Sequence, residues 1–124
     1  MLLKNILLVG VGGALGSVAR YLGNKFISQL YPQSFPVGTF IVNILGCFLI
    51  GIFYGFANRQ EYFTPTFRLL LMTGFCGGFT TFSAFTLEGM QLLNEQRFLI
   101  FTLYFTLSVL LGLIATFTGT WLSQ

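Results

Sequence analysis

Four long apolar stretches constrain this chain more than any other feature. Each is long enough for a helix to cross the hydrocarbon core of a bilayer, about 30 Å, which takes about 20 apolar residues. Turn signals separate them, including Pro32, Pro36 and Pro65. No stretch remains for a soluble domain, so residues 1–124 are predicted to form one all-α membrane domain with four transmembrane helices. The predicted spans cover residues 5–30, 37–57, 67–92 and 98–122.

The charge content supports the membrane class and narrows the chemistry. Only 7% of the residues are charged and 55% are hydrophobic, whereas soluble domains are about 25% charged. The chain has no histidine and only three acidic residues, which removes most acid–base and metal chemistry. We therefore expect no enzymatic activity. Cys47 and Cys76 lie in apolar runs and are interpreted as small packing residues.

Lys and Arg are almost evenly divided between the two sides. Four spans place both termini on one side together with the 57–67 loop. Orientation depends on the difference in Lys and Arg between the sides, so this balance predicts insertion in both orientations. Two oppositely inserted copies then pair about an axis in the membrane plane, like the inverted repeats of transporters. The two groups are Lys4, Arg59 and Arg68 against Lys25 and Arg97, with Arg20 added if its side chain reaches out.

Polar side chains inside the predicted spans are few, and such residues usually face a cavity or a partner. Arg20 is interpreted either as an anion attractor at a pore mouth or as a side chain that snorkels to the interface. Asn43 shares a helical face with Thr39, four residues earlier. Its amide offers an N–H donor to a passing anion, although a bond to a neighbouring helix is the commoner use.

The fourth span carries one narrow polar stripe. Tyr104 and Ser108 are four residues apart, and the same line continues through Gly112 to Thr116. Such hydroxyl groups either join helices or form a track of hydrogen-bond donors.

The stretch "GFCGGFTTFSAF", residues 74–85, is unusually rich in glycine and threonine for a membrane helix. Gly74, Gly77 and Gly78 favour a break in the third helix, followed at once by Thr80 and Thr81. Backbone that is not helical survives in a membrane only when protein buries it or when it lines a cavity. Its free carbonyls can bind a small cation such as Na⁺; the alternative is a glycine kink that serves close packing.

In the first span, glycines also predict a smooth packing face: Gly10, Gly12, Gly13 and Gly16.

Phenylalanines in the same stretch are spaced as one face of a helix: Phe75, Phe79, Phe82 and Phe85. Such a stripe usually contacts lipid or core. An aromatic ring also has a positive edge, so ring edges that point into a narrow pore would partly solvate a small anion without a fixed charge.

These motifs resemble those of the fluoride channel family (Fluc, also called CrcB). "GFCGGFTTFSAF" is similar to its third-helix signature, "GVGGALGSVARY" to its first-helix motif and "PVGTFIVNILGCFLIG" to its second-helix motif. The resemblance covers all four spans. It implies a dual-topology antiparallel homodimer in the cytoplasmic membrane, with two fluoride pores and a structural Na⁺ at the dimer centre.

The resemblance also implies roles for individual residues. The backbone carbonyls of Gly77 and Thr80 would hold the Na⁺. The sequence departs from the family pattern at Gly112, where a hydroxyl residue is expected, and at Ala84. From its own position two turns beyond Thr81, and not from the resemblance, Glu88 is interpreted as a solvated interfacial carboxylate, with gating as the alternative. The fluoride pore would be lined by Phe82, Phe85, Ser83, Asn43, Thr39, Tyr104 and Ser108, with Arg20 from the first motif.

The predicted function is passive fluoride export, which confers fluoride resistance. Fluoride enters a cell as neutral HF, ionises and is trapped, and a channel lets the anion leave. Two other classes stay open. A small proton-coupled multidrug antiporter also has four spans, but it needs an acidic residue that the first span lacks. A membrane assembly subunit explains the glycine faces but not the break together with the aromatic and polar stripes.

Overall fold

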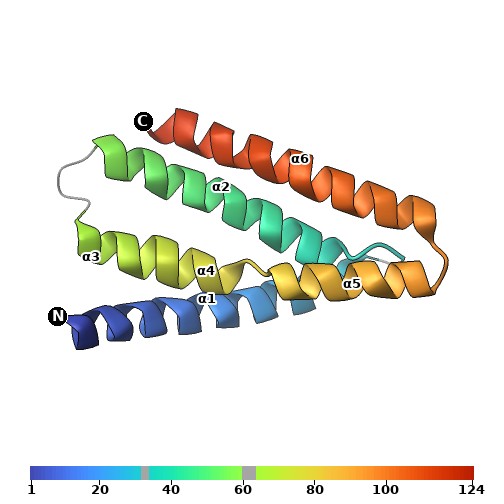
Figure 1. The fold of residues 1–124 in the computed structure, drawn as a ribbon, viewed down its shortest axis with the longest axis horizontal. Coiled ribbons are helices and arrows are strands. Elements are labelled where there is room, and N and C mark those ends of the chain that lie inside the picture. The colour runs from blue at the N-terminus through green and yellow to red at the C-terminus, as the bar shows by residue number, and fades with distance from the viewer. Residues whose placement is uncertain (32–33, 60–63) are drawn as a thin grey trace.

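The computed structural model describes residues 1–31, 34–59 and 64–124. Every element in this part of the chain is helical, and four segments are long and apolar enough to cross a membrane. The chain therefore has the composition and architecture of a multi-pass membrane protein, and both termini lie at the same end (Figure 1). The elements are α1 (Leu2–Leu30), α2 (Val37–Arg59), α3 (Pro65–Phe67), the π-helix η1 (Arg68–Cys76), α4 (Gly77–Phe79), α5 (Phe82–Asn94) and α6 (Phe98–Ser123).

The third segment, Pro65–Asn94, is interrupted as predicted, although not at the glycines. Gly74 lies within η1, and Gly77 and Gly78 within α4; the interruption falls on Thr80 and Thr81. Gly78 is needed for packing, because a Cβ atom there would overlap with the carbonyl of Gly13 in α1. The glycines therefore let two helices approach, and the break follows one turn later.

The first half of the third segment packs on α1 along a seam of glycines. A Cβ atom at Gly12 would overlap with the carbonyl oxygen of Leu70, and one at Gly16 with that of Phe75. Small residues allow this backbone contact, which drives helix association in membranes. Gly10 does not belong to the seam, since no atom lies within 4 Å of the place a Cβ would take. The packing face predicted for the first span is thus narrower than expected.

A second seam joins α2 to α6. A Cβ atom at Gly51 would overlap with the backbone of Thr116, and one at Gly119 with that of Phe48. The Thr116 hydroxyl donates to the carbonyl of Cys47 at 3.2 Å, so the two helices are also joined by a hydrogen bond. Figure 1 shows α2 and α6 lying side by side, and these contacts join the middle of α2 to the C-terminal half of α6.

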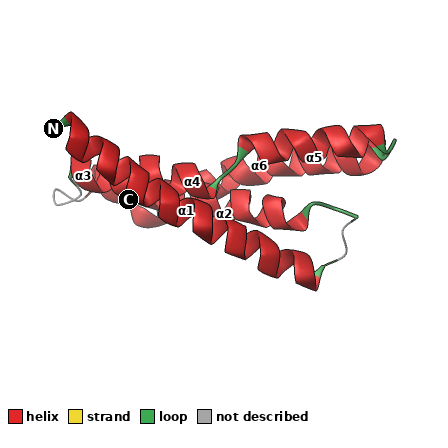
Figure 2. Ribbon diagram, turned by 90° about the horizontal axis from the view of Figure 1, so that it is seen from below, coloured by secondary structure: helices red, strands yellow, loops and turns green. Residues whose placement is uncertain are grey.

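After the break, α5 leaves α1 and lies along α6 (Figure 2). Gly89 of α5 faces the rings of Phe101 and Phe105 in α6. The end of α5 is closed by a bond from the Arg97 N–H to the Leu92 carbonyl, 2.9 Å, the pattern of a Schellman motif. The third segment thus packs against two different helices.

The interruption also divides the phenylalanine stripe. The spacing predicted one helical face, but Thr80 and Thr81 have extended backbone and interrupt the helical period. Two separate pairs result. Phe75 and Phe79 stack with ring centroids 5.7 Å apart, and the rings of Phe82 and Phe85 are 6.0 Å apart and tilted.

Candidate functional site

The site is built around the two extended residues between α4 and α5. Thr80 has φ −88° and ψ 157°, and Thr81 has φ −146° and ψ 121°. Each threonine closes one helix end: the Thr80 hydroxyl donates to the Cys76 carbonyl at 2.9 Å, and the Thr81 hydroxyl accepts from the Ala84 N–H at 3.1 Å. Thr81 is therefore the N-cap of α5, and the break is a local structure that the sequence encodes.

Asn43 of α2 holds the break from one side. Its Oδ1 accepts from the Thr81 N–H at 2.8 Å, and its Nδ2 donates to the Thr81 carbonyl at 3.0 Å. The side chain thus binds both backbone groups of one residue. In a continuous α-helix the Thr81 N–H would bond the Gly77 carbonyl, four residues earlier. Here the Thr81 N–H bonds Asn43, and the Gly77 carbonyl loses its usual helical partner.

Arg20 of α1 holds the break from the other side. Its Nε donates to the Gly78 carbonyl at 3.0 Å, a group that would bond the Phe82 N–H if the helix continued. The carbonyl end of a helix carries partial negative charge, so a guanidinium there is also electrostatically favourable. The rest of the guanidinium borders a groove along α1 that also contains Tyr21 and Lys25.

A cleft of about 500 Å³ opens beside the break. It brings together several of the predicted residues, and it also contains Thr73 and both cysteines. Cys76 is buried, Cys47 is half-buried, and both thiols are free. The predicted residues that line it are Asn43, Gly77, Thr80, Phe82, Phe85 and Ser108.

The two phenylalanines of the cleft have opposite environments. Phe85 is 8% exposed and packs on Phe105 of α6, with ring centroids 4.3 Å apart. Phe82 is 77% exposed and projects from the chain. Ser83 is exposed as well, and its hydroxyl lies 3.4 Å from that of Thr81. Phe85 is therefore part of the packed core of this chain, whereas the Phe82 ring is open to the surroundings.

Tyr104 lies behind Phe85 in the core and is fully buried. Its ring meets that of Phe85 with centroids 5.0 Å apart. The carboxyl group of Glu88 lies beside Tyr104 and the buried Thr39. Yet one Glu88 oxygen and the Tyr104 hydroxyl are buried without a well-formed hydrogen bond to any described residue. Buried polar atoms normally have partners, and here the nearest polar groups to Glu88 are those of Thr39 and Tyr104.

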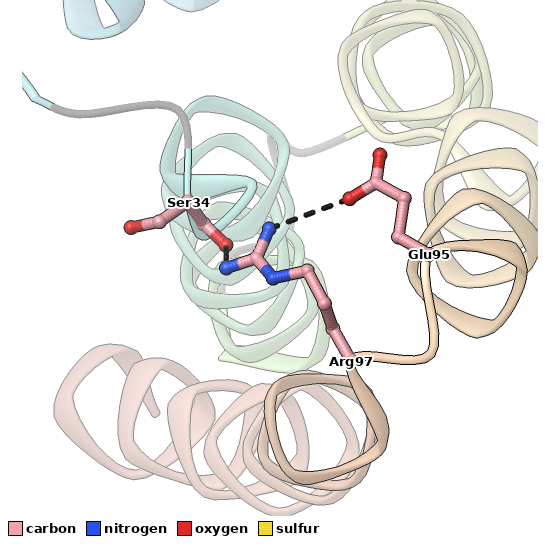
Figure 3. Close-up of polar contacts among 3 residues, drawn as sticks. All are labelled: Ser34, Glu95 and Arg97. Atoms are coloured by element: carbon pink, nitrogen blue, oxygen red, sulfur yellow. Dashed lines mark hydrogen bonds and ion pairs between the residues drawn. The ribbon is translucent and has the colours of Figure 1, made fainter.

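Glu88 also borders a polar pocket of about 210 Å³ between the end of α1 and the face of α5. Arg97 closes one side: its guanidinium donates to the Ser34 carbonyl and lies 3.6 Å from the Glu95 carboxylate (Figure 3). The guanidinium thus joins the start of α6 to the chain preceding α2. Glu88 of α5 lines this pocket and has one buried carboxyl oxygen, and its predicted interfacial position stays a prediction.

The polar stripe of the fourth span divides between two roles. Ser108 lines the cleft beside the break. Thr116 donates to Cys47 in the α2–α6 seam, and Gly112 packs with the Cys47 sulfur 3.4 Å from the position of its missing Cβ. Beyond Ser108 the stripe therefore serves helix packing.

Sequence reasoning missed two functions of this region. Thr81 both ends the break and binds Asn43. A threonine immediately before the apolar Phe82 is the N-cap signal that identifies it. Arg97 was counted only as a charge, although it organises the polar pocket. No sequence signal identifies its carbonyl partner, because Ser34 is 63 residues away.

Comparison with known proteins places this architecture in a family. Residues 7–120 match the family described as CrcB-like protein, Camphor Resistance (CrcB). The chain belongs to this family.

Several relatives are named fluoride-specific ion channel FluC. One from Flavobacterium psychrophilum is 49% identical over 117 residues, 94% of each chain. One from Phocaeicola vulgatus is 45% identical over 122 residues, 98% of this chain and all of the relative. One from Leptospira interrogans is 43% identical over 119 residues, 96% of this chain and 94% of the relative. These names describe ion channels, and they favour a channel over the antiporter and the assembly subunit.

Proposed function

We propose that this protein is a fluoride-selective channel of the cell membrane that exports cytoplasmic fluoride by passive flow. The observation that carries the proposal is full-length similarity to proteins named as fluoride-specific channels, 49% over 94% of the chain in one case. The chain's own chemistry agrees, because the break region combines neutral hydrogen-bond donors with aromatic rings and offers no acidic residue in α1 for proton coupling.

The pores lie at the interface of an antiparallel homodimer. Phe82 and Ser83 are exposed on one chain beside the break, which supports a second chain that encloses them. The near balance of Lys and Arg supports insertion in both orientations, which supplies the two opposed copies. A two-fold axis through the break then generates two equivalent pores.

Each pore replaces the hydration of fluoride with mostly neutral contacts, and Arg20 adds one cationic group. The edges of Phe82 and Phe85 present the positive rim of the ring quadrupole, while Ser83 and Ser108 supply hydroxyl donors. Tyr104 and Thr39 are buried beside Glu88, behind the wall of the cleft, and back the pore with polar groups. Asn43 retains a second N–H for the anion, and Arg20 retains the donors of its guanidinium that Gly78 does not use. Neutral donors favour passage because they do not hold the anion as a fixed charge would.

A structural Na⁺ fits the break on chemical grounds. The Thr81 N–H bonds Asn43, which leaves the Gly77 carbonyl without its usual helical donor. Gly77 and Thr80 line the same cleft, and hard carbonyl oxygens suit an alkali cation. The carbonyls of Gly77 and Thr80 from two chains would hold the ion, and its charge would fix the two interruptions against each other.

Fluoride efflux from reconstituted liposomes, followed with a fluoride electrode, tests the proposal. We expect rapid fluoride release and no chloride release. Phe82→Ile and Phe85→Ile are expected to cripple fluoride efflux while the dimer still forms, because aliphatic side chains have no positive edge. Vesicles that hold their fluoride gradient would contradict channel function, and undiminished flux in both variants would remove the rings from the mechanism.

The antiparallel arrangement has its own test. A C-terminal tag is expected to be labelled from both sides of the membrane in intact cells and inverted vesicles. Labelling from one side only would exclude dual topology while leaving the channel activity to be judged by the efflux measurement.

A further inference from the structure

Two side chains from different helices bind the backbone groups that the break exposes. Asn43 of α2 bonds both the N–H and the carbonyl of Thr81, at 2.8 and 3.0 Å. Arg20 of α1 bonds the Gly78 carbonyl at 3.0 Å. The chain therefore satisfies these groups with its own side chains, and the interruption does not depend on a bound ion for these partners.

Both side chains compete with helix closure. If residues 80 and 81 became helical, the Thr81 N–H would bond the Gly77 carbonyl and the Phe82 N–H would bond the Gly78 carbonyl. Asn43 binds the Thr81 N–H, so this group is not available to the Gly77 carbonyl. Arg20 binds the Gly78 carbonyl, so this group is not available to the Phe82 N–H. The same contacts that stop the helix thus leave the Gly77 carbonyl available.

We infer that Asn43 and Arg20 are positioning residues, which hold the third segment open so that the carbonyls of Gly77 and Thr80 form a cation site before the cation arrives. The inference rests on the cation site of the proposed function. It assigns Asn43 a task beyond donating to an anion, and it gives the Arg20 guanidinium a fixed partner.

The energetic consequence concerns the affinity for the cation. A ligand that binds only the open conformation has an apparent affinity reduced by the fraction of protein that is open. Loss of the Asn43 amide lets the helix close and consume the Gly77 carbonyl. We therefore expect Asn43→Ala to raise the Na⁺ concentration for half-saturation at least about tenfold.

The experiment titrates Na⁺ against N-methylglucamine and follows the thermal unfolding midpoint of the purified protein, because a ligand that binds only the folded state raises that midpoint. Asn43→Ala is expected to shift the half-saturating Na⁺ concentration most, and Arg20→Gln less, since glutamine keeps a neutral donor. Thr73→Ala is the matched control: it removes a hydroxyl from η1 in the lining of the same cleft, outside the break and outside the proposed pore, and its Na⁺ titration should equal that of the wild type.

Asn43→Asp separates positioning from anion donation. Aspartate keeps an acceptor for the Thr81 N–H but has no N–H to offer an anion. Positioning predicts that Thr80 and Thr81 keep extended backbone in this variant without Na⁺, even if its fluoride flux is lost. The backbone is the readout here because a carboxylate attracts Na⁺ by its charge alone, and helical shifts at these two residues would contradict the role of the acceptor.

The backbone can also be observed directly without sodium. The ¹³C chemical shifts of Thr80 and Thr81 in N-methylglucamine should be those of extended residues in the wild type and move toward helical values in Asn43→Ala. Extended shifts in this variant, or an unchanged Na⁺ titration, would overturn the inference. If the wild type shows no Na⁺-specific stabilisation, the cation site of the proposed function fails, and the shifts alone decide whether Asn43 holds the break. Should Asn43→Ala not fold, Arg20→Gln carries both measurements and Asn43→Asp carries the chemical shifts.

Discussion

The two halves of the third segment are held in different ways. The first half meets α1 backbone to backbone, with Gly12 against Leu70 and Gly16 against Phe75. The second half, α5, meets α6 through rings, with Phe85 stacked on Phe105. A backbone seam fixes the position of a helix rigidly, whereas a contact between side chains can adjust. The break joins a fixed half to an adjustable half.

The comparison explains why the functional residues lie where they do. The fixed half ends at the carbonyls of the proposed cation site, and a site of this kind needs rigid support. The adjustable half begins with Phe82 and Phe85, whose rings border the proposed pore. An uninterrupted helix could not give the two sets of residues different neighbours.

The largest expected effect separates the two rings of the adjustable half. Phe85→Ala should lower the free energy of unfolding by about 3–5 kcal/mol, because it empties a buried aromatic position. Phe82→Ala should cost far less within one chain, because the Phe82 ring is exposed. Denaturation in mixed micelles of mild detergent and SDS measures both. An equal cost for the two variants would show that a second chain covers Phe82.

A glycine substitution in each half of the third segment tests directly whether the two halves are held differently. Gly12→Ala places a methyl group against backbone atoms of η1 and should cost about 3 kcal/mol, since backbone cannot move aside. Gly89→Ala has its nearest contacts with the ring ends of Phe101 and Phe105, which give way more easily than backbone, and should cost about 1 kcal/mol.

Gly10→Ala is the control on α1, because its new methyl group meets nothing within 4 Å. We expect it to be neutral or slightly stabilising, since alanine favours helices over glycine. The same micelle titration ranks the three glycine variants. A Gly89→Ala cost as large as that of Gly12→Ala would show that both halves are held equally rigidly.

The joint between the halves predicts a smaller effect. Thr81→Ala removes the hydroxyl that caps α5 and should cost about 1 kcal/mol. Thr81→Ser keeps the hydroxyl and should restore most of that stability. Thermal unfolding in detergent distinguishes them, and equal midpoints for the two variants would mean that the cap does not stabilise α5.

The smallest expected effect lies at the far end of the adjustable half. Gln96 has φ 59°, a conformation that glycine adopts without steric cost. Gln96→Gly should therefore stabilise the protein by about 0.5–1 kcal/mol. Asn94→Gly is the control, because it places glycine in the helical part of α5 and should destabilise. A midpoint that falls in both variants would contradict the interpretation of this turn.

Much of the fold could be predicted because long apolar segments have few alternatives in a membrane. Their helices begin and end close to the predicted ranges. The glycines of the first span predicted a close contact with another helix, and Gly12 and Gly16 form that contact with η1. The position of the break was harder to predict, because glycine permits both an interruption and a tight contact. Only the neighbouring helix decides between them, and here Gly78 packs on Gly13.

The sequence selected residues that lie close together in the fold, but it did not predict their arrangement. The sequence identified Asn43, Arg20, Phe82 and Phe85, and the structure places all four around the break. It did not reveal that Asn43 binds Thr81, because that contact joins residues 38 apart. Nor did the regular spacing of the phenylalanines show that an extended pair of threonines divides them.

By itself, the sequence determined a membrane protein of four helical segments and a family, since hydrophobic length and local motifs are properties of the chain in order. Only the tertiary structure decided which backbone groups are free at the break and which ring is covered. Those properties depend on which donors and side chains the neighbouring helices bring close to the break. The sequence alone does not give the distances between residues on different helices.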